Sequence, residues 1–190
     1  MIAGVLGGTF DPPHLGHLQV ATTVLGAGLV DEVWMVPCLT HRFGKAPVPF
    51  HHRVAMCEQL AGEDPRIKVS EIEAELNRPG YTLDLVELLM ARHPDTAFRL
   101  KAGTDIYHER NKWHRYDDVA ELAPPIYVER RGQPPIPGPT LAAPPDIRSS
   151  RIREAIRRGE RPSGLTLDRI LDYIDAEGLY RQRPGRLTGD

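Results

Sequence analysis

Short apolar runs alternate along the chain with longer segments in which hydrophobic residues recur at helical spacing. The apolar runs are bounded by glycine, proline or polar turns, which is typical of strands buried on both faces. The predicted strands are residues 2–6, 33–36, 67–69, 97–100 and 126–128. The predicted helices are residues 14–29, 50–60, 83–92, a short helix from residue 105, and residues 117–122, 149–158 and 166–177. This alternation predicts an α/β layered fold with a mainly parallel sheet.

The segment 132–145 interrupts this pattern. It holds six prolines, so we expect a long, exposed surface loop. Two helices follow it, and Gly178 is the expected C-cap of the second. A length of 190 residues suits one domain. We therefore expect a single domain over residues 1–190, with a C-terminal helical part at 146–180 and a frayed polar tail at 181–190.

Composition and charge exclude several classes of function. Lys and Arg number 24 against 26 Asp and Glu, and a net charge of −2 argues against a general nucleic-acid or membrane-surface binder. No apolar run approaches a membrane span, and the N-terminus lacks the regions of a secretory signal. We expect a cytoplasmic protein with no nucleic-acid or membrane partner. Cys38 and Cys57 alone give neither a disulfide framework nor a zinc site.

The most informative stretch is residues 7–17, GGTFDPPHLGH. Gly7 and Gly8 follow the first predicted strand and let the backbone pass close to a ligand. A helix then begins, and its free N–H groups and dipole favour an anion. His14 and His17 are three residues apart, so both imidazoles can share one face of the first helical turn. The pattern predicts a phosphate site at the carboxyl end of a parallel strand.

Other interpretations of this stretch are weaker. The sequence contains neither G-x-x-x-x-G-K-[ST] nor G-x-G-x-x-G, which argues against a P-loop kinase and an ordinary NAD-binding domain. Paired histidines alone are more often surface or core residues. A zinc site needs a third ligand at metal-site spacing, and His14 and His17 have no obvious one, so we assign no metal ligand.

A second anion site is indicated at residues 148–153, RSSRIR. Ser149 or Ser150 is a natural N-cap for the helix that begins here. Backbone amides, hydroxyls and three guanidinium groups converge on this helix start, which suits a polyphosphate. The alternative is a capped basic helix on the surface.

Both stretches resemble signatures of the HxGH-type nucleotidyltransferase superfamily. Residues 9–17 reproduce its T-F-D-P…H-x-G-H element, and residues 147–153 resemble its I-S-S-T-x-I-R element, with Arg148 in place of the first Ser. The resemblance implies a Rossmann-like, doubly wound sheet with a C-terminal helical segment. It implies catalytic roles toward nucleotide phosphates for His14, His17, Lys45 and Arg153. The implied ATP-binding residues are Gly7, Gly8, Thr9, Phe10, Gly16, Gly103, Asp105, Ile147, Ser149, Ser150 and Ile152.

The middle of the chain resembles bacterial nicotinate-nucleotide adenylyltransferases. Residues 80–84 resemble their Y-T-x-D element, residues 103–105 their G-x-D, residues 113–116 their W-x-x-W and residues 127–132 their R-P-G element. Leu85 and Tyr116 depart from the pattern. Asp105 has an alternative role as a helix cap. The resemblance implies that the acceptor is bound by Tyr81, Thr82, Trp113 and Arg130.

The implied reaction transfers AMP from ATP to nicotinate mononucleotide and releases deamido-NAD and pyrophosphate. Mg²⁺ is the implied cofactor, held mostly by substrate oxygens and water. ATP and nicotinate mononucleotide are the expected partners. The sequence leaves open whether the protein forms a homo-oligomer. The alternatives are the same chemistry on nicotinamide mononucleotide, phosphopantetheine or a small alcohol phosphate. A non-catalytic nucleotide sensor and a metal-binding histidine protein are further alternatives.

Overall fold

The protein is described from a computed structural model that covers residues 1–39, 47–62, 64–76 and 80–181. Five parallel strands form one sheet in the order β3-β2-β1-β4-β5. The strands are β1 (Ile2–Gly8), β2 (Glu32–Pro37), β3 (Ile67–Val69), β4 (Ala97–Gly103) and β5 (Ile126–Val128). The predicted α/β, Rossmann-like parallel sheet is confirmed. β1 and β4 run two or three residues further than expected, because the sheet pairs their glycine-rich ends.

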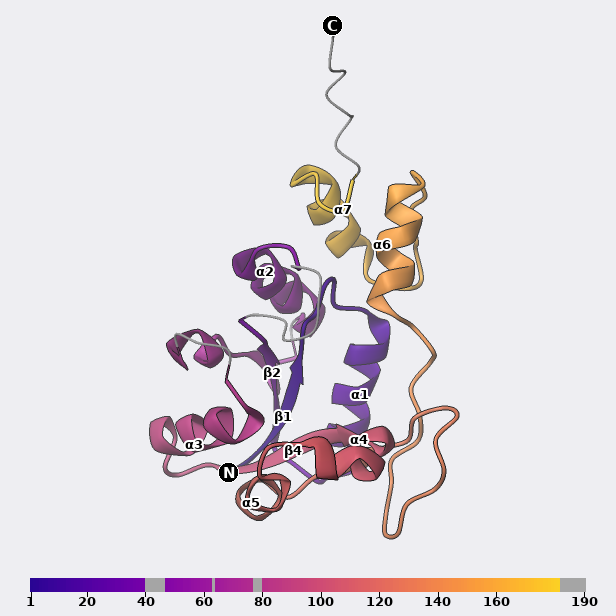
Figure 1. Cartoon of the computed structure of the whole chain (residues 1–190). Coiled ribbons are helices and arrows are strands. Elements are labelled where there is room, and N and C mark those ends of the chain that lie inside the picture. The colour runs from indigo at the N-terminus through magenta and orange to yellow at the C-terminus, as the bar shows by residue number, and fades with distance from the viewer. Residues whose placement is uncertain (40–46, 63, 77–79, 182–190) are drawn as a thin grey trace, which may run out of the picture.

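Helices cover both faces of the sheet (Figure 1). The α-helices are α1 (Leu15–Gly26), α2 (Phe50–Ala61), α3 (Thr82–Arg92), α4 (Thr104–Glu109), α5 (Tyr116–Leu122), α6 (Ser149–Arg157) and α7 (Asp168–Ala176). Two 3₁₀ turns are η1 (Ile72–Leu76) and η2 (Arg110–Lys112). The helix predicted over residues 14–29 ends at Gly26, where glycine weakens helical structure and Gly28 takes a positive φ of 65°.

Two hydrophobic clusters lie on opposite faces of the sheet. One joins α1, α2, α6 and α7 to residues such as Leu6 and Met35. The other joins α3 and α5 to residues such as Val5 and Trp34. Successive strand residues therefore point into different cores, as expected for strands covered on both sides.

The central strand β1 lies at the topological switch point of the sheet. From β1 the chain continues to β2 and β3 on one side, and after β3 it crosses to β4 and β5 on the other side of β1. In open α/β sheets, ligands bind in the crevice beyond the carboxyl ends of the strands at such a point. Figure 1 shows α6 and α7 beyond that end of β1, so the C-terminal part of the chain completes this region.

The proline-rich segment between β5 and α6 is mostly exposed, as its composition predicts. It is nevertheless fixed to the sheet, because Leu141 exchanges backbone hydrogen bonds with Tyr127 and Glu129. Ile136 is buried within the same segment. Among the described residues, no helix is both long and apolar enough to cross a membrane.

Candidate active site

The turn after β1 is shaped by Gly8 and Phe10. Phe10 has a positive φ of 50°, and its ring is buried beneath the turn. A Cβ atom at Gly8 would lie only 3.2 Å from Cζ of that ring. Glycine at position 8 therefore lets the buried aromatic ring support the turn from below while the backbone remains open toward a ligand.

His14 and His17 lie together at the start of α1, as their spacing predicts. Their rings are stacked, with centroids 3.7 Å apart and an interplanar angle of 22°. The backbone N–H of His14, the N-cap residue, donates to His17 Nδ1 at 3.1 Å. Phe10 contacts the His17 ring edge to face, with centroids 4.8 Å apart. The two imidazoles are thus held at the positive end of a helix dipole.

Both imidazoles are neutral at pH 7 in the unliganded protein. Burial lowers the pKa of His14 to about 4. Burial is also the main reason why the pKa of His17 lies well below its usual value, and repulsion from a protonated His14 and from the cations Lys101 and Arg130 lowers it further. Among the described residues, His14 Nδ1 has no hydrogen-bond partner. An anion bound in front of these rings would favour the protonated imidazoles.

A cavity of about 610 Å³ opens beside these histidines. It lies between the end of β1, the start of α1 and the segment that leads into α6. Cationic side chains outnumber acidic ones in its wall, which favours an anionic ligand. Its lining residues are Leu6, Gly7, Gly8, His14, Gly16, His17, Val20, Lys101, Glu129, Arg130, Arg131, Gln133, Ala143, Pro144, Pro145, Asp146, Ile147 and Arg148.

The second predicted anion motif is bound directly to the first. Ser149 Oγ donates to the Pro12 carbonyl at 2.8 Å, and Arg153 Nη1 donates to the Asp11 carbonyl at 2.6 Å. Arg153 Nη1 also lies 3.6 Å from Asp11 Oδ2. These side chains join α6 to the turn after β1, and the cavity beside them is lined by Ile147 and Arg148.

The expected serine N-cap of α6 and the alternative role of Asp105 as a helix cap are both wrong. The N-cap of α6 is Arg148 rather than a serine. Ser149 is the first residue of the helix, and its hydroxyl donates to the distant Pro12 carbonyl. Asp105 does not cap α4, whose N-cap is Gly103. Its carboxylate instead pairs with Arg130 Nε at 3.2 Å. Gly178 lies one residue beyond the C-cap of α7, at a φ of 62°, which is the usual place for a helix-ending glycine.

The remaining ATP-side residues are divided between the cavity and the core. Gly7, Gly8, Gly16 and Ile147 line the cavity. Ile152 is fully buried in the core. Ser150 lies half-buried in the first turn of α6, and Thr9 has its carbonyl bound by Arg53. Lys45 lies outside the described residues.

The predicted acceptor residues form a separate group, except for Arg130, which lines the histidine cavity. Tyr81 and Thr82 start α3, and the Tyr81 ring lies 4.1 Å from the ring of His114. Trp113, next in sequence to His114, borders a shallow depression with Tyr116 on the same side of the molecule. The fold therefore brings the aromatic residues together beside α3 and α5.

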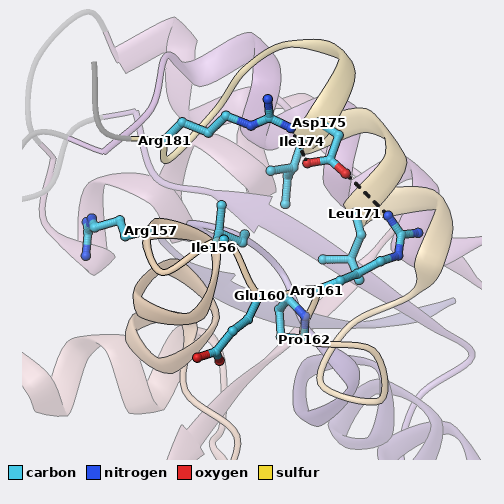
Figure 2. Close-up of a pocket in the computed structure, with 10 residues that line it drawn as sticks. Ile156, Arg157, Glu160, Arg161, Pro162, Leu171, Ile174, Asp175 and Arg181 are labelled. Carbon is cyan, nitrogen blue, oxygen red and sulfur yellow. Dashed lines mark hydrogen bonds and ion pairs between the residues drawn. The ribbon is translucent and has the colours of Figure 1, made fainter. Parts of the chain in front are cut away.

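Another cavity, of about 440 Å³, lies between α6 and α7 (Figure 2). Arg161 pairs there with Asp172 at 2.7 Å and with Asp175 at 3.4 Å. Asp175 also accepts from Arg181 at 2.8 Å. Because these charges neutralise one another, this cavity attracts an anion less strongly than the histidine cavity does.

Sequence reasoning missed several cavity residues, above all Lys101. Lys101 lies in β4, two residues before the Gly103 that the sequence singled out. The rule that ligands gather at the carboxyl ends of strands beside the switch point could have indicated it. The other missed residues with polar or charged side chains are Glu129, Arg131, Gln133 and Asp146.

Comparison with known proteins identifies the family. The family model for cytidylyltransferase-like proteins matches residues 5–155. A relative from Anaeromyxobacter dehalogenans, named "Probable nicotinate-nucleotide adenylyltransferase", is 44% identical over 181 residues, which cover 93% of this chain and 95% of the relative. The chain belongs to the nicotinate-nucleotide adenylyltransferases of the cytidylyltransferase-like family. The predicted family and the predicted nucleotidyltransferase class are thereby confirmed.

Other adenylyltransferases are similar over the same length. A Geobacillus kaustophilus protein of the same name is 36% identical over 188 residues, covering 96% of this chain and 87% of its own. The solved structure of a Plasmodium falciparum nicotinic acid mononucleotide adenylyltransferase complexed with NaAD has a TM-score of 0.80 at 20% identity, covering 94% of this chain and 97% of that chain. This structural similarity supports the fold of the adenylyltransferase described here.

Proposed function

We propose that the protein transfers AMP from ATP to nicotinate mononucleotide, giving deamido-NAD and pyrophosphate, a step of NAD biosynthesis. The observation that carries the proposal is the stacked pair His14 and His17 at the start of α1, facing a cavity with a cationic wall. The names of the relatives and the NaAD in the Plasmodium falciparum structure support the same reaction.

The reaction needs alignment and charge stabilisation more than an activated nucleophile. A phosphate oxygen of the acceptor forms a bond to the α-phosphorus of ATP, and the bond from that phosphorus to the pyrophosphate oxygen breaks. Gly7 and Gly8 let the triphosphate approach the backbone. His14, His17 and the free N–H groups of α1 then act as donors to the charge that develops in the transition state. Arg130, which lines the same cavity, binds the acceptor phosphate.

Histidines that are neutral before substrate binds suit this role of stabilising charge in the transition state. A neutral imidazole at rest does not hold a permanent buried charge that would need a counter-ion. When a polyphosphate enters, its negative charge raises the pKa of both rings. The proposed site therefore gains positive charge at the moment when the substrate brings negative charge.

Mg²⁺ would be bound together with ATP, mainly by phosphate oxygens and water, as is general for this ion. The cavity carboxylates Glu129 and Asp146 are the protein groups that could complete its coordination shell. When bound, the ion would neutralise triphosphate charge and help pyrophosphate to leave.

The acceptor's pyridine ring is assigned to the aromatic group on α3 and before α5. An aromatic face at Trp113 suits stacking on a pyridine. The backbone N–H of Tyr81 already donates to Asp84 Oδ2 at 2.7 Å. The N–H groups of the helical turn that begins at Thr82 would suit a carboxylate. These two features favour nicotinate mononucleotide over its amide and over phosphopantetheine, which remain the alternatives.

Two broader inferences accompany this function. Residues 1–190 form one nucleotidyltransferase domain, supported by the shared core of α1, α2, α6 and α7. The protein works in the cytoplasm on free small molecules and without a nucleic-acid partner, supported by its net charge of −2.

A pyrophosphate-release assay tests the function. The protein is given ATP, Mg²⁺ and, in separate reactions, nicotinate mononucleotide, nicotinamide mononucleotide or phosphopantetheine. The highest kcat/KM is expected for nicotinate mononucleotide. His17→Ala should lower kcat about 10²–10³-fold, about 2.7–4 kcal/mol of transition-state stabilisation, with less effect on ATP binding. His51→Ala, an exposed residue of α2, is the control. No pyrophosphate with any acceptor, or wild-type turnover in His17→Ala, would refute the assignment.

A further inference from the structure

Lys101 connects the apolar core to the histidine cavity. It is a half-buried residue of β4, on the face of the sheet that α1 covers. The side chain borders a narrow apolar gap with Leu6, Val20 and Ile126, and it also lines the cavity that holds His17. Long lysine stems commonly lie along apolar surface while the ammonium reaches a polar region. The carbon stem of Lys101 thus belongs to the core, and its charge to the cavity.

The ammonium of Lys101 has no partner among the residues that the structure describes. The other two described lysines each pair with a carboxylate: Lys68 with Glu32 at 2.6 Å and Lys112 with Glu109 at 2.8 Å. Burial lowers the pKa of Lys101, and the charge of Arg130 lowers it further, while Asp105 opposes both. A partly desolvated cation without a counter-ion is costly, and an anion in the cavity would remove that cost.

Lys101 is electrostatically linked to two groups of the proposed mechanism, and it lines the same cavity as both of them. It lowers the pKa of His17, and Arg130 in turn lowers the pKa of Lys101. His17 is assigned to the ATP phosphates and Arg130 to the acceptor phosphate. Lys101 therefore lies where both reacting phosphates must come close, although the two anions repel each other.

We propose that Lys101 is a further catalytic residue, whose ammonium binds phosphate oxygens at the reacting centre between His17 and Arg130. The inference rests on the proposed function. A point charge with three rotatable donors suits a centre whose oxygens move during an in-line displacement. It would hold two anions together and stabilise the charge at the α-phosphorus.

Lys101→Met tests this role, because methionine keeps an unbranched apolar stem and removes the charge. The variant is compared with wild type and with Lys68→Met, which removes an exposed, paired lysine from β3. We expect kcat/KM of Lys101→Met to fall about 10²–10³-fold, mostly in kcat, while Lys68→Met stays at the wild-type value. The urea midpoint of unliganded Lys101→Met should equal or exceed that of wild type, because a purely structural lysine would lower it.

A kcat of Lys101→Met within threefold of wild type would overturn the proposal. If Lys101→Met is less stable than wild type, the kcat of Lys101→Arg is measured as well. A kcat of Lys101→Arg at least tenfold above that of Lys101→Met supports the role of the charge. A kcat of Lys101→Arg as low as that of Lys101→Met overturns the proposal. Wild-type protein that is inactive with every acceptor would refute the proposed function instead. Calorimetric binding of inorganic tripolyphosphate then decides for Lys101: tenfold weaker binding by Lys101→Met supports a phosphate contact, and equal affinity excludes it.

Discussion

The phenol of Tyr180 donates a 2.8 Å hydrogen bond to Oδ1 of Asp11, 169 positions earlier in the chain. The same carboxylate oxygen accepts from the Val48 backbone N–H at 3.3 Å, and Arg153 approaches the other oxygen. Burial, and then the neighbouring carboxylate, raise the pKa of Tyr180 and keep its proton in place. Asp11 therefore joins the phosphate turn to the C-terminal part of the chain.

Removing the Tyr180 hydroxyl should destabilise the whole protein. Tyr180→Phe is expected to lower the free energy of unfolding by about 1.5–3 kcal/mol, because the hydrogen bond goes to a charged, half-buried acceptor. Urea denaturation measures the change. Tyr173→Phe is the control, since its hydroxyl contacts His52 Nδ1 at 2.8 Å rather than a carboxylate, and it should lose less. Equal losses in both variants would show that the carboxylate adds nothing.

Replacing Arg53 should lower the free energy of unfolding more than Tyr180→Phe does. The Arg53 side chain is only 1% exposed, and its guanidinium donates to the backbone carbonyls of Val48, Thr9, Cys38 and Leu39. Arg53→Met would leave these acceptors without their donor, so we expect a loss of at least about 3 kcal/mol in the free energy of unfolding.

Arg99→Met provides the comparison for Arg53 in the same urea experiment. Arg99 also donates to two backbone carbonyls, but at 3.4 and 3.5 Å and nearer to solvent. We expect its loss to stay below about 1 kcal/mol. Similar losses for the two arginines would contradict the role given to Arg53, which is to hold the phosphate turn against the segments that flank residues 40–46.

The sequence predicts local features of this site better than its long-range ones. The parallel sheet and the paired imidazoles follow from apolar runs and from a spacing of three residues. The N-cap of α6 does not follow from the local sequence, because Ser149 donates to the carbonyl of Pro12, 137 positions away. Lys101 was missed because a polar residue in a strand usually marks ordinary alternation. Only the strand order shows that β4 lies beside β1 and brings this lysine to the histidines.

Stability should depend on pH through His14. Its pKa is about 4 in the folded protein and about 6.5 in the unfolded chain. Between these values the unfolded chain binds the extra proton, so stability falls as pH decreases from about 6.5 toward 4, by at most about 1.4 kcal/mol per pH unit. The difference between wild type and His14→Asn, measured by urea unfolding at several pH values, isolates this contribution. A difference that is constant between pH 7 and 4.5 would contradict the lowered pKa.

Alanine substitutions at two glycines of α1, Gly16 and Gly26, should separate effects on activity from effects on stability. A Cβ atom at Gly16 would lie 3.0 Å from His14 Nδ1 and 3.1 Å from Cε1, so Gly16→Ala must shift the ring that stacks on His17 by a few tenths of an ångström. Gly26, at the exposed end of α1, has nothing within 4 Å of its Cβ position. Both alanines favour the helix by up to about 1 kcal/mol.

We expect Gly16→Ala to lose roughly tenfold or more in kcat/KM without unfolding, because a small misplacement of a catalytic group is costly. Gly26→Ala should keep wild-type activity and gain stability. Pyrophosphate release and urea midpoints measure both effects, and a fully active Gly16→Ala would mean that catalysis does not need the stacked position of His14.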